Sequence, residues 1–280
     1  MTHSEKLLVR FFAITAETQG CGERDVILGL SAVNPMERAV EFLPNRAGKG
    51  VPIAIIDSGV HAEHPHVAGV AGGIFVHADG SLSDDYVDRL GHGTAVAAAI
   101  REKAPAAGLY AVKIFSDSLA APIAALIRAI DWAAEAGARL INLSLGTSGT
   151  EHEAALLEAV KRAQERNAVL VAACEDLGVR WLPGSLPGVL PVRLDWSLSR
   201  HEYHAEQNER IVFRASGYPR PIPGIPPERN IKGISFAVAN MTGFCARALE
   251  AYPEADLGDL IDVLAGPKLR PQTSDFRPQT

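Results

Sequence analysis

The stretch VPIAIIDSGV, residues 51–60, decides the fold, because an apolar run leads directly into an aspartate, a serine and a glycine. A short, uninterrupted apolar run is typical of a strand that is buried on both faces, as in a parallel sheet. Asp57 ends the run, so we expect its carboxylate at the carboxyl end of a buried strand. Ligand sites of open α/β sheets gather at that edge. The stretch therefore predicts an α/β fold with a polar site at one edge of the sheet.

Three further apolar runs follow along the chain, and longer helical patterns separate them. The runs are LYAVKIF (109–115), RLINLSL (139–145) and AVLVAA (168–173). One helix is expected to begin near Pro122 and to stop at Gly137, and another to span about 151–166 and end at Asn167. Strands that alternate with crossover helices predict a central, mainly parallel sheet with helices on both faces.

Length and composition indicate one domain with a large apolar core. The chain has 280 residues, 47% of them hydrophobic, and a net charge of −6. Its lysines and arginines are scattered, so nucleic acid is not an expected partner. No stretch approaches the roughly 20 apolar residues of a spanning helix, so a membrane is not expected either. The sequence leaves the oligomeric state open.

The three cysteines favour a reducing compartment. Cys21, Cys174 and Cys245 are far apart and form no Cys-x-x-Cys pair, so neither a disulfide framework nor a zinc site is indicated. Cys245 lies in an apolar helical pattern, and we interpret it as a buried, inert thiol.

Two more motifs supply a base and a nucleophile to accompany Asp57. GHGTAVAAAI (91–100) places His92 between two glycines at an expected helix start, and GISFAVANMTG (233–243) places Ser235 at another. A serine hydroxyl becomes reactive when an imidazole takes its proton and a carboxylate orients that imidazole. Taken singly, each residue has an ordinary structural role in a turn, a helix start or a cap. Their joint occurrence favours a catalytic triad.

The order of these motifs resembles that of the subtilisin-like serine proteases, the subtilases. The resemblance runs from about Val51 to Leu249 and includes YAVKIF (110–115), INLSLG (141–146) and LPGSLPGVLPV (182–192). It implies a subtilisin-like, three-layer α/β fold and peptide-bond cleavage through an acyl-enzyme. The family's counterpart of INLSLG binds an extended substrate, so Ser144, Leu145 and Gly146 are expected to offer their backbone to a peptide as a neighbouring strand.

The chain departs from the family pattern where the oxyanion is stabilised. The family segment usually ends Ala-Ala-Gly-Asn, whereas residues 172–176 read AACED, which puts Asp176 at the asparagine position. An ionised carboxylate has no hydrogen to donate and repels an oxyanion, so Asp176 must be protonated, turned away or tolerated. Burial beside another carboxylate would raise its pKa and favour the neutral, donating acid. In addition, Ile234 and Ala239 stand where the family usually has threonine and proline.

The first specificity pocket differs as well. By resemblance, Ala173 belongs to its wall, Glu175 falls where a glycine usually lines it, and Trp181 falls near another glycine at its floor. An indole there would fill the pocket, so a small residue is expected before the scissile bond. The alternative is a preference for a basic residue, directed by Glu175.

By the same resemblance the chain divides into an N-terminal extension (1–50) packed on the catalytic domain, the catalytic domain (51–265) and a flexible, proline-containing tail (266–280). Only 56 residues precede Asp57, too few for both the signal peptide and the folding pro-domain of secreted subtilases. We therefore expect a cytoplasmic enzyme that needs no autoactivation. Its expected substrate is a peptide or an unfolded protein segment, as in the maturation of ribosomally made peptides.

Structural calcium is common in the family, and four aspartates between the first two motifs could ligate it: Asp79, Asp84, Asp85 and Asp88. Their spacing does not match an EF-hand loop, and a solvated acidic loop is the favoured interpretation. No other cofactor is expected.

Two alternative functions stay open. The departures in the oxyanion site and the pocket fit a catalytically impaired, subtilase-like module that binds peptides. The same acyl-enzyme could also pass its acyl group to an amine, as in a transpeptidase or macrocyclase. No sequence feature decides among the three.

Overall fold

The computed structural model describes residues 10–11, 13–14, 42–118, 120–207 and 209–266. The expected tail therefore lies almost wholly outside the described residues, and so does most of the N-terminal extension. Among the described residues, no helix has the length and apolar content needed to cross a bilayer.

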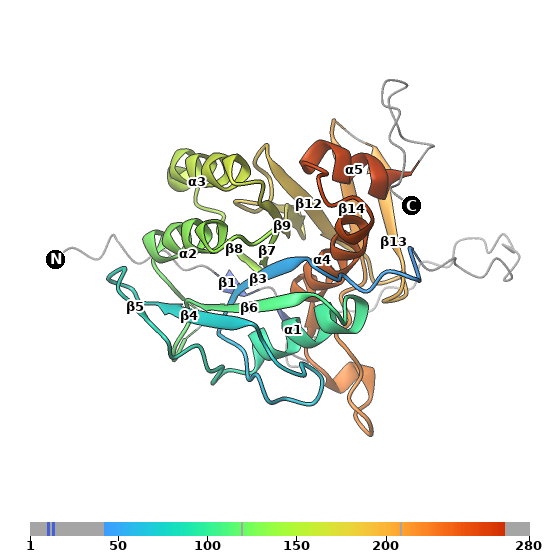
Figure 1. The fold of residues 1–280 in the computed structure, drawn as a ribbon, viewed down its shortest axis with the longest axis horizontal. Helices are drawn as coiled ribbons and strands as arrows, with labels where there is room; N and C mark the ends of the chain where they lie inside the picture. The colour runs from blue at the N-terminus through green and yellow to red at the C-terminus, as the bar shows by residue number, and fades with distance from the viewer. Residues whose placement is uncertain (1–9, 12, 15–41, 119, 208, 267–280) are drawn as a thin grey trace, which may run out of the picture.

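A nine-stranded sheet runs through the centre of the molecule (Figure 1). Its strand order is β13-β14-β12-β9-β7-β3-β6-β4-β5, and neighbours pair in parallel except at the edge strands β13 and β5. In chain order these strands are β3 (Pro52–Asp57), β4 (Gly72–Val76), β5 (Leu82–Ser83), β6 (Gly108–Lys113), β7 (Leu140–Leu143), β9 (Val169–Ala173), β12 (Val189–Leu194), β13 (Tyr203–Gln207) and β14 (Ile211–Ala215). The predicted α/β class and the mainly parallel sheet are confirmed.

Helices cover both faces of this sheet and give the fold its three layers (Figure 1). They are α1 (His92–Lys103), α2 (Ile123–Glu135), α3 (Glu153–Glu165), α4 (Ile234–Ala251) and α5 (Leu257–Ala265). Helices α1, α4 and α5 share one apolar cluster with Ile53 and Ile55 of β3, whereas α2 and α3 share another with Ala54 and Ile56. Alternate strand residues point to opposite faces, so burial on both sides explains the uninterrupted apolar run of β3.

The two expected crossover helices form where local signals place them. Pro122 precedes α2, and Gly137 follows it with a φ of +82°. A short 3₁₀ turn, Thr150–His152, leads into α3, and Asn167 follows that helix with a φ of +59°. Proline at a helix start and a left-handed residue after a helix end are both backbone signals, which is why the sequence located them.

The region 178–232 is more regular than its composition suggests. The region is rich in proline and glycine, yet it supplies β12, β13 and β14, which extend the central sheet on one side. Pro191 lies inside β12, opposite Ala172 of β9. Because proline is rare within central strands, it obscured this strand in the sequence.

Candidate active site

Asp57 and His92 form a buried acid–base pair at the carboxyl end of β3. The Nδ1 atom of His92 lies 2.9 and 3.0 Å from the two carboxylate oxygens of Asp57. Asp57 is fully buried and His92 is 7% exposed. A Cβ on Gly93 would lie 2.1 Å from the carbonyl oxygen of Gly59, so only glycine lets the first turn of α1 approach β3 this closely. The sequence prediction that the helix anchors the imidazole near Asp57 agrees with this arrangement.

Asp88 holds the loop that presents His92. Its carboxylate accepts five hydrogen bonds, from the Ser58 hydroxyl, the backbone N–H groups of Leu90 and Gly91, and both the N–H and the hydroxyl of Thr94. A carboxylate at a helix N-terminus is favoured by the free N–H groups there and by the helix dipole. The sequence pattern placed Asp88 in an acidic loop and did not reveal this role, which depends on a contact with Ser58, 30 residues away.

Ser235 lies in the first turn of α4 and is fully buried. Its hydroxyl donates to the carbonyl oxygen of Ser144 at 3.3 Å, and the Ser144 hydroxyl donates to the carbonyl oxygen of Ser235 at 3.0 Å. The next residue, Phe236, brings its ring centroid to 5.9 Å from that of His92. The start of α4 therefore lies beside both the histidine and the predicted peptide-binding segment.

A buried chain of hydrogen bonds supports this junction from behind. Thr242 donates to the side-chain oxygen of Asn142 at 2.9 Å, and Asn142 donates to the Ser144 hydroxyl at 3.0 Å. All three side chains are buried. Asn142 and Thr242 were not predicted as site residues. The available signal was an asparagine within the apolar run RLINLSL, since a buried polar side chain needs partners.

Two short backbone edges flank the nucleophile, and the N-terminal segment pairs with both. β8 (Leu145–Gly146) pairs antiparallel with β1 (Arg10–Phe11), as Figure 1 shows, and β15 (Lys232–Gly233) pairs antiparallel with β2 (Ala13–Ile14). Leu145 and Gly146 thus accept an extended backbone, the kind of pairing predicted for them. Here the paired strand comes from the chain itself.

Asp176 lies in a tight hairpin that follows β9. The hairpin joins β10 (Glu175–Asp176) to β11 (Val179–Arg180) through Leu177 and Gly178, which both have positive φ. Burial raises the pKa of Asp176, and the charge of Glu175 raises it further, while the backbone N–H of Leu177 opposes the shift. The environment therefore favours the neutral form of this acid at a higher pH than usual.

Glu175 and Trp181, the two other altered pocket residues, both contact neighbouring parts of the protein. The Glu175 carboxylate lies 2.5 Å from a guanidinium nitrogen of Arg193. Trp181 is partly buried and packs against the apolar cluster that contains Ala173, and its backbone N–H donates to the carbonyl oxygen of Cys174 at 3.0 Å. The charge of Glu175 is therefore already balanced within the protein.

Three of the four aspartates of the calcium hypothesis have separate protein partners. Asp79 accepts from Ser81, Asp85 pairs with Arg89 at 2.9 Å, and Asp88 binds the helix start. Among the described residues, no group of three or more acidic, histidine or cysteine side chains is arranged to hold a metal ion.

Two of the cysteines lie in the described part of the chain, and both are free and buried, whereas Cys21 lies outside it. Burial raises the pKa of both the Cys174 and the Cys245 thiols. Cys245 is fully buried in α4, as expected of an inert thiol.

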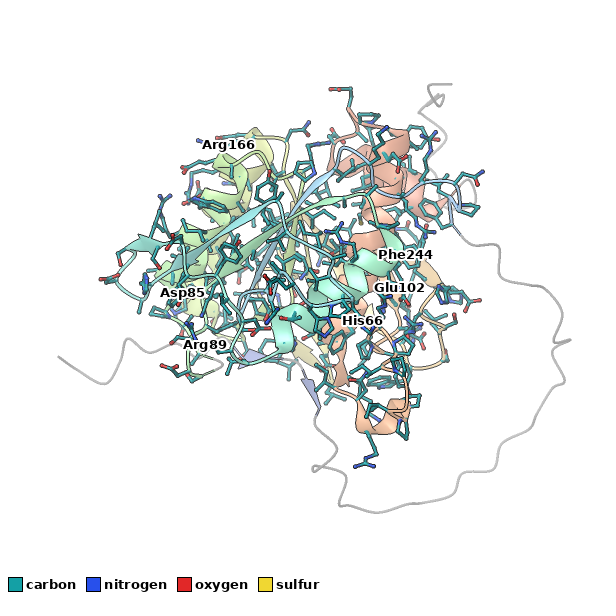
Figure 2. All side chains as sticks on the ribbon, turned by 60° about the horizontal axis from the view of Figure 1, so that its bottom comes forward. His66, Asp85, Arg89, Glu102, Arg166 and Phe244 are labelled. Carbon is teal, nitrogen blue, oxygen red and sulfur yellow. The ribbon has the colours of Figure 1, made fainter. Side chains whose placement is uncertain are left out.

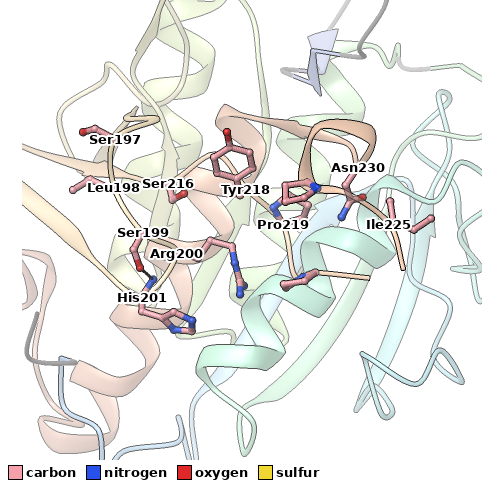
Figure 3. A pocket seen from close by; sticks show the side chains of 12 residues that line it. Ser197, Leu198, Ser199, Arg200, His201, Ser216, Tyr218, Pro219, Ile225 and Asn230 are labelled. Atoms are coloured by element: carbon pink, nitrogen blue, oxygen red, sulfur yellow. Dashed lines mark hydrogen bonds between the residues drawn. The ribbon is translucent and has the colours of Figure 1, made fainter. Parts of the chain in front are cut away.

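A cavity of about 550 Å³ lies apart from the triad residues, between the segments 197–201 and 216–230 (Figure 3). None of Asp57, His92 and Ser235 lines it. This cavity is therefore separate from the predicted triad.

Comparison with known proteins agrees with this geometry. Residues 48–177 match the subtilase family, peptidase S8. Subtilisin DY from Bacillus licheniformis is 28% identical over 225 residues, which cover 74% of this chain and 79% of that protein. Thermitase from Thermoactinomyces vulgaris is 36% identical over 143 residues, about half of either chain (47% and 49%).

Solved structures show the same fold. A cold adapted subtilisin-like serine proteinase superposes with a TM-score of 0.60 at 22% identity, covering 78% of this chain and 81% of that one. A lanthipeptide protease superposes with a TM-score of 0.60 at 19% identity, covering 78% and 80%. The family match over residues 48–177, the curated relatives and the shared fold agree in supporting a subtilisin-like serine protease of the subtilase family.

Proposed function

We propose that Asp57, His92 and Ser235 hydrolyse peptide bonds as a catalytic triad. The observation that carries the proposal is the buried Asp57–His92 pair, with both carboxylate oxygens within 3.0 Å of Nδ1. Asp57 engages Nδ1, so Nε2 is the atom that takes the proton from Ser235 as its Oγ attacks the carbonyl carbon. The same proton passes to the leaving amine. Water then repeats the sequence on the acyl-enzyme and releases the acid.

The substrate is an extended peptide or an unfolded protein segment. The N-terminal segment supports this, because its backbone pairs with β8 on one side of the nucleophile and with β15 on the other. A substrate strand has the same two edges available to it, and main-chain pairing supplies affinity that does not depend on side chains. The segment must leave, at least locally, before a substrate can pair there.

We propose that two groups stabilise the oxyanion. The free backbone N–H groups of the first turn of α4 are one source of hydrogen bonds. The other is Asp176, which donates only as the neutral acid, and burial and Glu175 both raise its pKa. We infer a low basal rate and an acid-shifted pH optimum.

Before the scissile bond, we propose a small substrate residue. Trp181 is bulky and packs against the apolar cluster that includes Ala173, which supports a filled pocket. The ion pair of Glu175 with Arg193 argues against the alternative preference for a basic residue, since an added cation would compete with an existing one. A peptide library checks this, and a strong preference for large aromatic residues at that position would refute it.

We also propose a finer role, the maturation of a ribosomally made peptide in the cytoplasm. Its support is limited to the free, buried thiols Cys174 and Cys245 and to the fold shared with a lanthipeptide protease. Incubation with a leader-bearing precursor peptide and with a folded control protein tests it. One cut in the precursor and none in the folded protein is the expected result, and unselective digestion of both would contradict it.

An active-site fluorophosphonate tests the triad directly. The probe should modify the full-length chain once, on Ser235 by peptide mapping, and should not modify Ser235→Ala. Absence of labelling in folded protein would overturn the proposal in favour of a peptide-binding module. Labelling together with a cyclic or amine-transferred product would favour the transpeptidase over the hydrolase.

A further inference from the structure

A cavity of about 390 Å³ borders α1, the helix that begins at His92, and several nitrogen-bearing side chains line it. Three segments line it: the histidine-bearing stretch 61–66, the first turns of α1 around Thr94, and the loop 219–231. Gly91, which precedes the catalytic histidine, also belongs to the wall. Figure 2 shows His66, one of the lining residues, beside α1. The triad residues themselves do not line it.

The register of the N-terminal segment shows which end of a substrate would reach this cavity. In the β2–β15 pair, Ala13 lies opposite Gly233 and Ile14 opposite Lys232. A strand continuing in the same direction next passes Ile231, and Ile231 lines the cavity. The segment meets β8 first and β15 second. A substrate bound in the same direction therefore carries the residues on the carboxyl side of its scissile bond towards the cavity.

Arg220 supplies the permanent positive charge of the lining. It is partly buried, and its guanidinium donates to the carbonyl oxygen of His66 at 3.1 Å, which fixes the side chain at the cavity wall. His61 and His64 are exposed at the rim and offer further ring nitrogens. Burial and the charge of Arg220 lower the pKa of His66, so the fixed cation is the arginine. A guanidinium is well suited to carboxylates because its N–H groups match both oxygens.

The one carboxylate of the lining has its oxygens occupied by hydrogen-bond donors of the protein. Asp88 contributes to the wall, but its two oxygens accept the five hydrogen bonds from Ser58, Leu90, Gly91 and Thr94. Its carboxylate is thus engaged with the start of α1, whereas Arg220 lines the cavity and donates a hydrogen bond to the carbonyl oxygen of His66. The remaining lining is largely apolar, with Ile222 and Ile231 among its members.

We propose that this cavity is a substrate subsite that takes an acidic side chain on the carboxyl side of the scissile bond, with Arg220 as its anchor. His61 and His64 add hydrogen bonds at the rim. The inference rests on the proposed peptidase function and adds a substrate class to it: peptides with aspartate or glutamate just beyond the residues that pair with β15.

Matched fluorogenic peptides test the subsite on the full-length chain. The peptides have the same sequence on the amino side of the scissile bond. At each of four positions on the carboxyl side they carry Glu, Gln or Lys in turn. Mass spectrometry of the products identifies the bond that is cleaved. The Glu peptide should exceed the Gln peptide in kcat/KM by about threefold to tenfold at one or two adjacent positions, with Lys lowest. Raised ionic strength should shrink that ratio.

Substitutions then show whether Arg220 causes the preference for Glu peptides. Arg220→Gln should abolish the preference for Glu by lowering kcat/KM for the Glu peptide to about that for the Gln peptide, while Arg220→Lys should keep part of the preference. Arg229→Gln is the matched control, since Arg229 is exposed on the same loop but does not line the cavity. That variant should retain the full preference.

The outcomes separate the two proposals. Equal kcat/KM for Glu, Gln and Lys peptides in the wild type, with the Gln peptide cleaved, overturns the subsite and leaves the peptidase standing. The subsite is likewise overturned if Arg220→Gln and Arg229→Gln reduce the preference equally. If no peptide is cleaved and Ser235 takes no fluorophosphonate, the peptidase proposal itself fails.

Discussion

The two halves of the catalytic region differ in how they are held. Around Asp57 and His92, the side chains are buried and connected by a dense set of hydrogen bonds centred on Asp88. Around Asp176, a short hairpin carries partly exposed charges, an ion pair to Arg193 and a raised pKa. The proton-transfer half keeps the family pattern, whereas the oxyanion half has changed. If the proposed roles hold, we expect changes in the second half to alter the rate more favourably than changes in the first.

The strongest test of the intact half is removal of the nucleophile. Ser235→Ala should lower kcat for peptide cleavage by on the order of 10⁴-fold or more, because the covalent route is lost. Loss of a hydroxyl at a helix start costs only about 0.5–2 kcal/mol, so the variant should still fold, as circular dichroism can show. Ser81→Ala, which changes an exposed loop serine bonded to Asp79, should cleave normally. Full activity in Ser235→Ala would remove the triad assignment.

A substitution at Asp176, in the altered half, should raise kcat where removal of Ser235 lowers it. Asp176→Asn places a permanent donor where the neutral acid donates only below its pKa, so kcat should rise by up to roughly 10²–10³-fold. Because the pKa of Asp176 is raised, wild-type activity should fall as pH rises through that value, and Asp176→Asn should flatten this alkaline limb. The measurement is kcat against pH.

Glu175→Gln sharpens the same test. The charge of Glu175 raises the pKa of Asp176, so its removal should lower that pKa and move the alkaline limb of the wild-type profile to lower pH. If Asp176→Asn changes neither rate nor profile, Asp176 does not face the oxyanion. If it destroys activity, the carboxyl has a positive role in catalysis other than donation to the oxyanion.

A smaller effect is expected from the support of the histidine loop. Asp88→Asn replaces an acceptor by an amide donor that faces N–H groups, so unfolding free energy should drop by about 1–3 kcal/mol. We expect kcat to fall about tenfold as His92 loses its fixed position. Urea denaturation and peptide kinetics measure the two effects. Asp85→Asn is the control, since Asp85 is partly exposed and pairs with Arg89 on the same loop, and it should leave both values unchanged.

The smallest expected effect concerns the N-terminal segment. Proline has no N–H and fits poorly in a paired strand, so Phe11→Pro combined with Ile14→Pro should weaken the pairing with β8 and β15. Because β8 and β15 would then be unpaired in a larger fraction of molecules, the apparent KM for peptides should fall about threefold to tenfold at unchanged kcat. A synthetic peptide of residues 6–18 should inhibit the variant competitively. An unchanged KM would mean that the segment does not compete with substrate.

The sequence by itself determined the features that depend on local backbone and on patterns of burial. The apolar run before Asp57 indicated a strand buried on both faces, and Pro122, Gly137 and Asn167 marked helix ends, because each signal acts on its own few residues. The order Asp57, His92, Ser235 likewise allowed a triad to be predicted, since each residue lies at a strand end or in the first turn of a helix.

Only the tertiary structure decided the features built from distant partners. The five hydrogen bonds of Asp88 and the buried chain from Thr242 through Asn142 to Ser144 join residues up to 100 positions apart, and a single polar side chain does not name its partner in the sequence. The pairing of β1 with β8 and of β2 with β15 involves two residues on each strand, too few to leave a periodic pattern. The cavity at Arg220 has the same origin: three segments that carry no common motif meet there because the sheet and α1 bring them together.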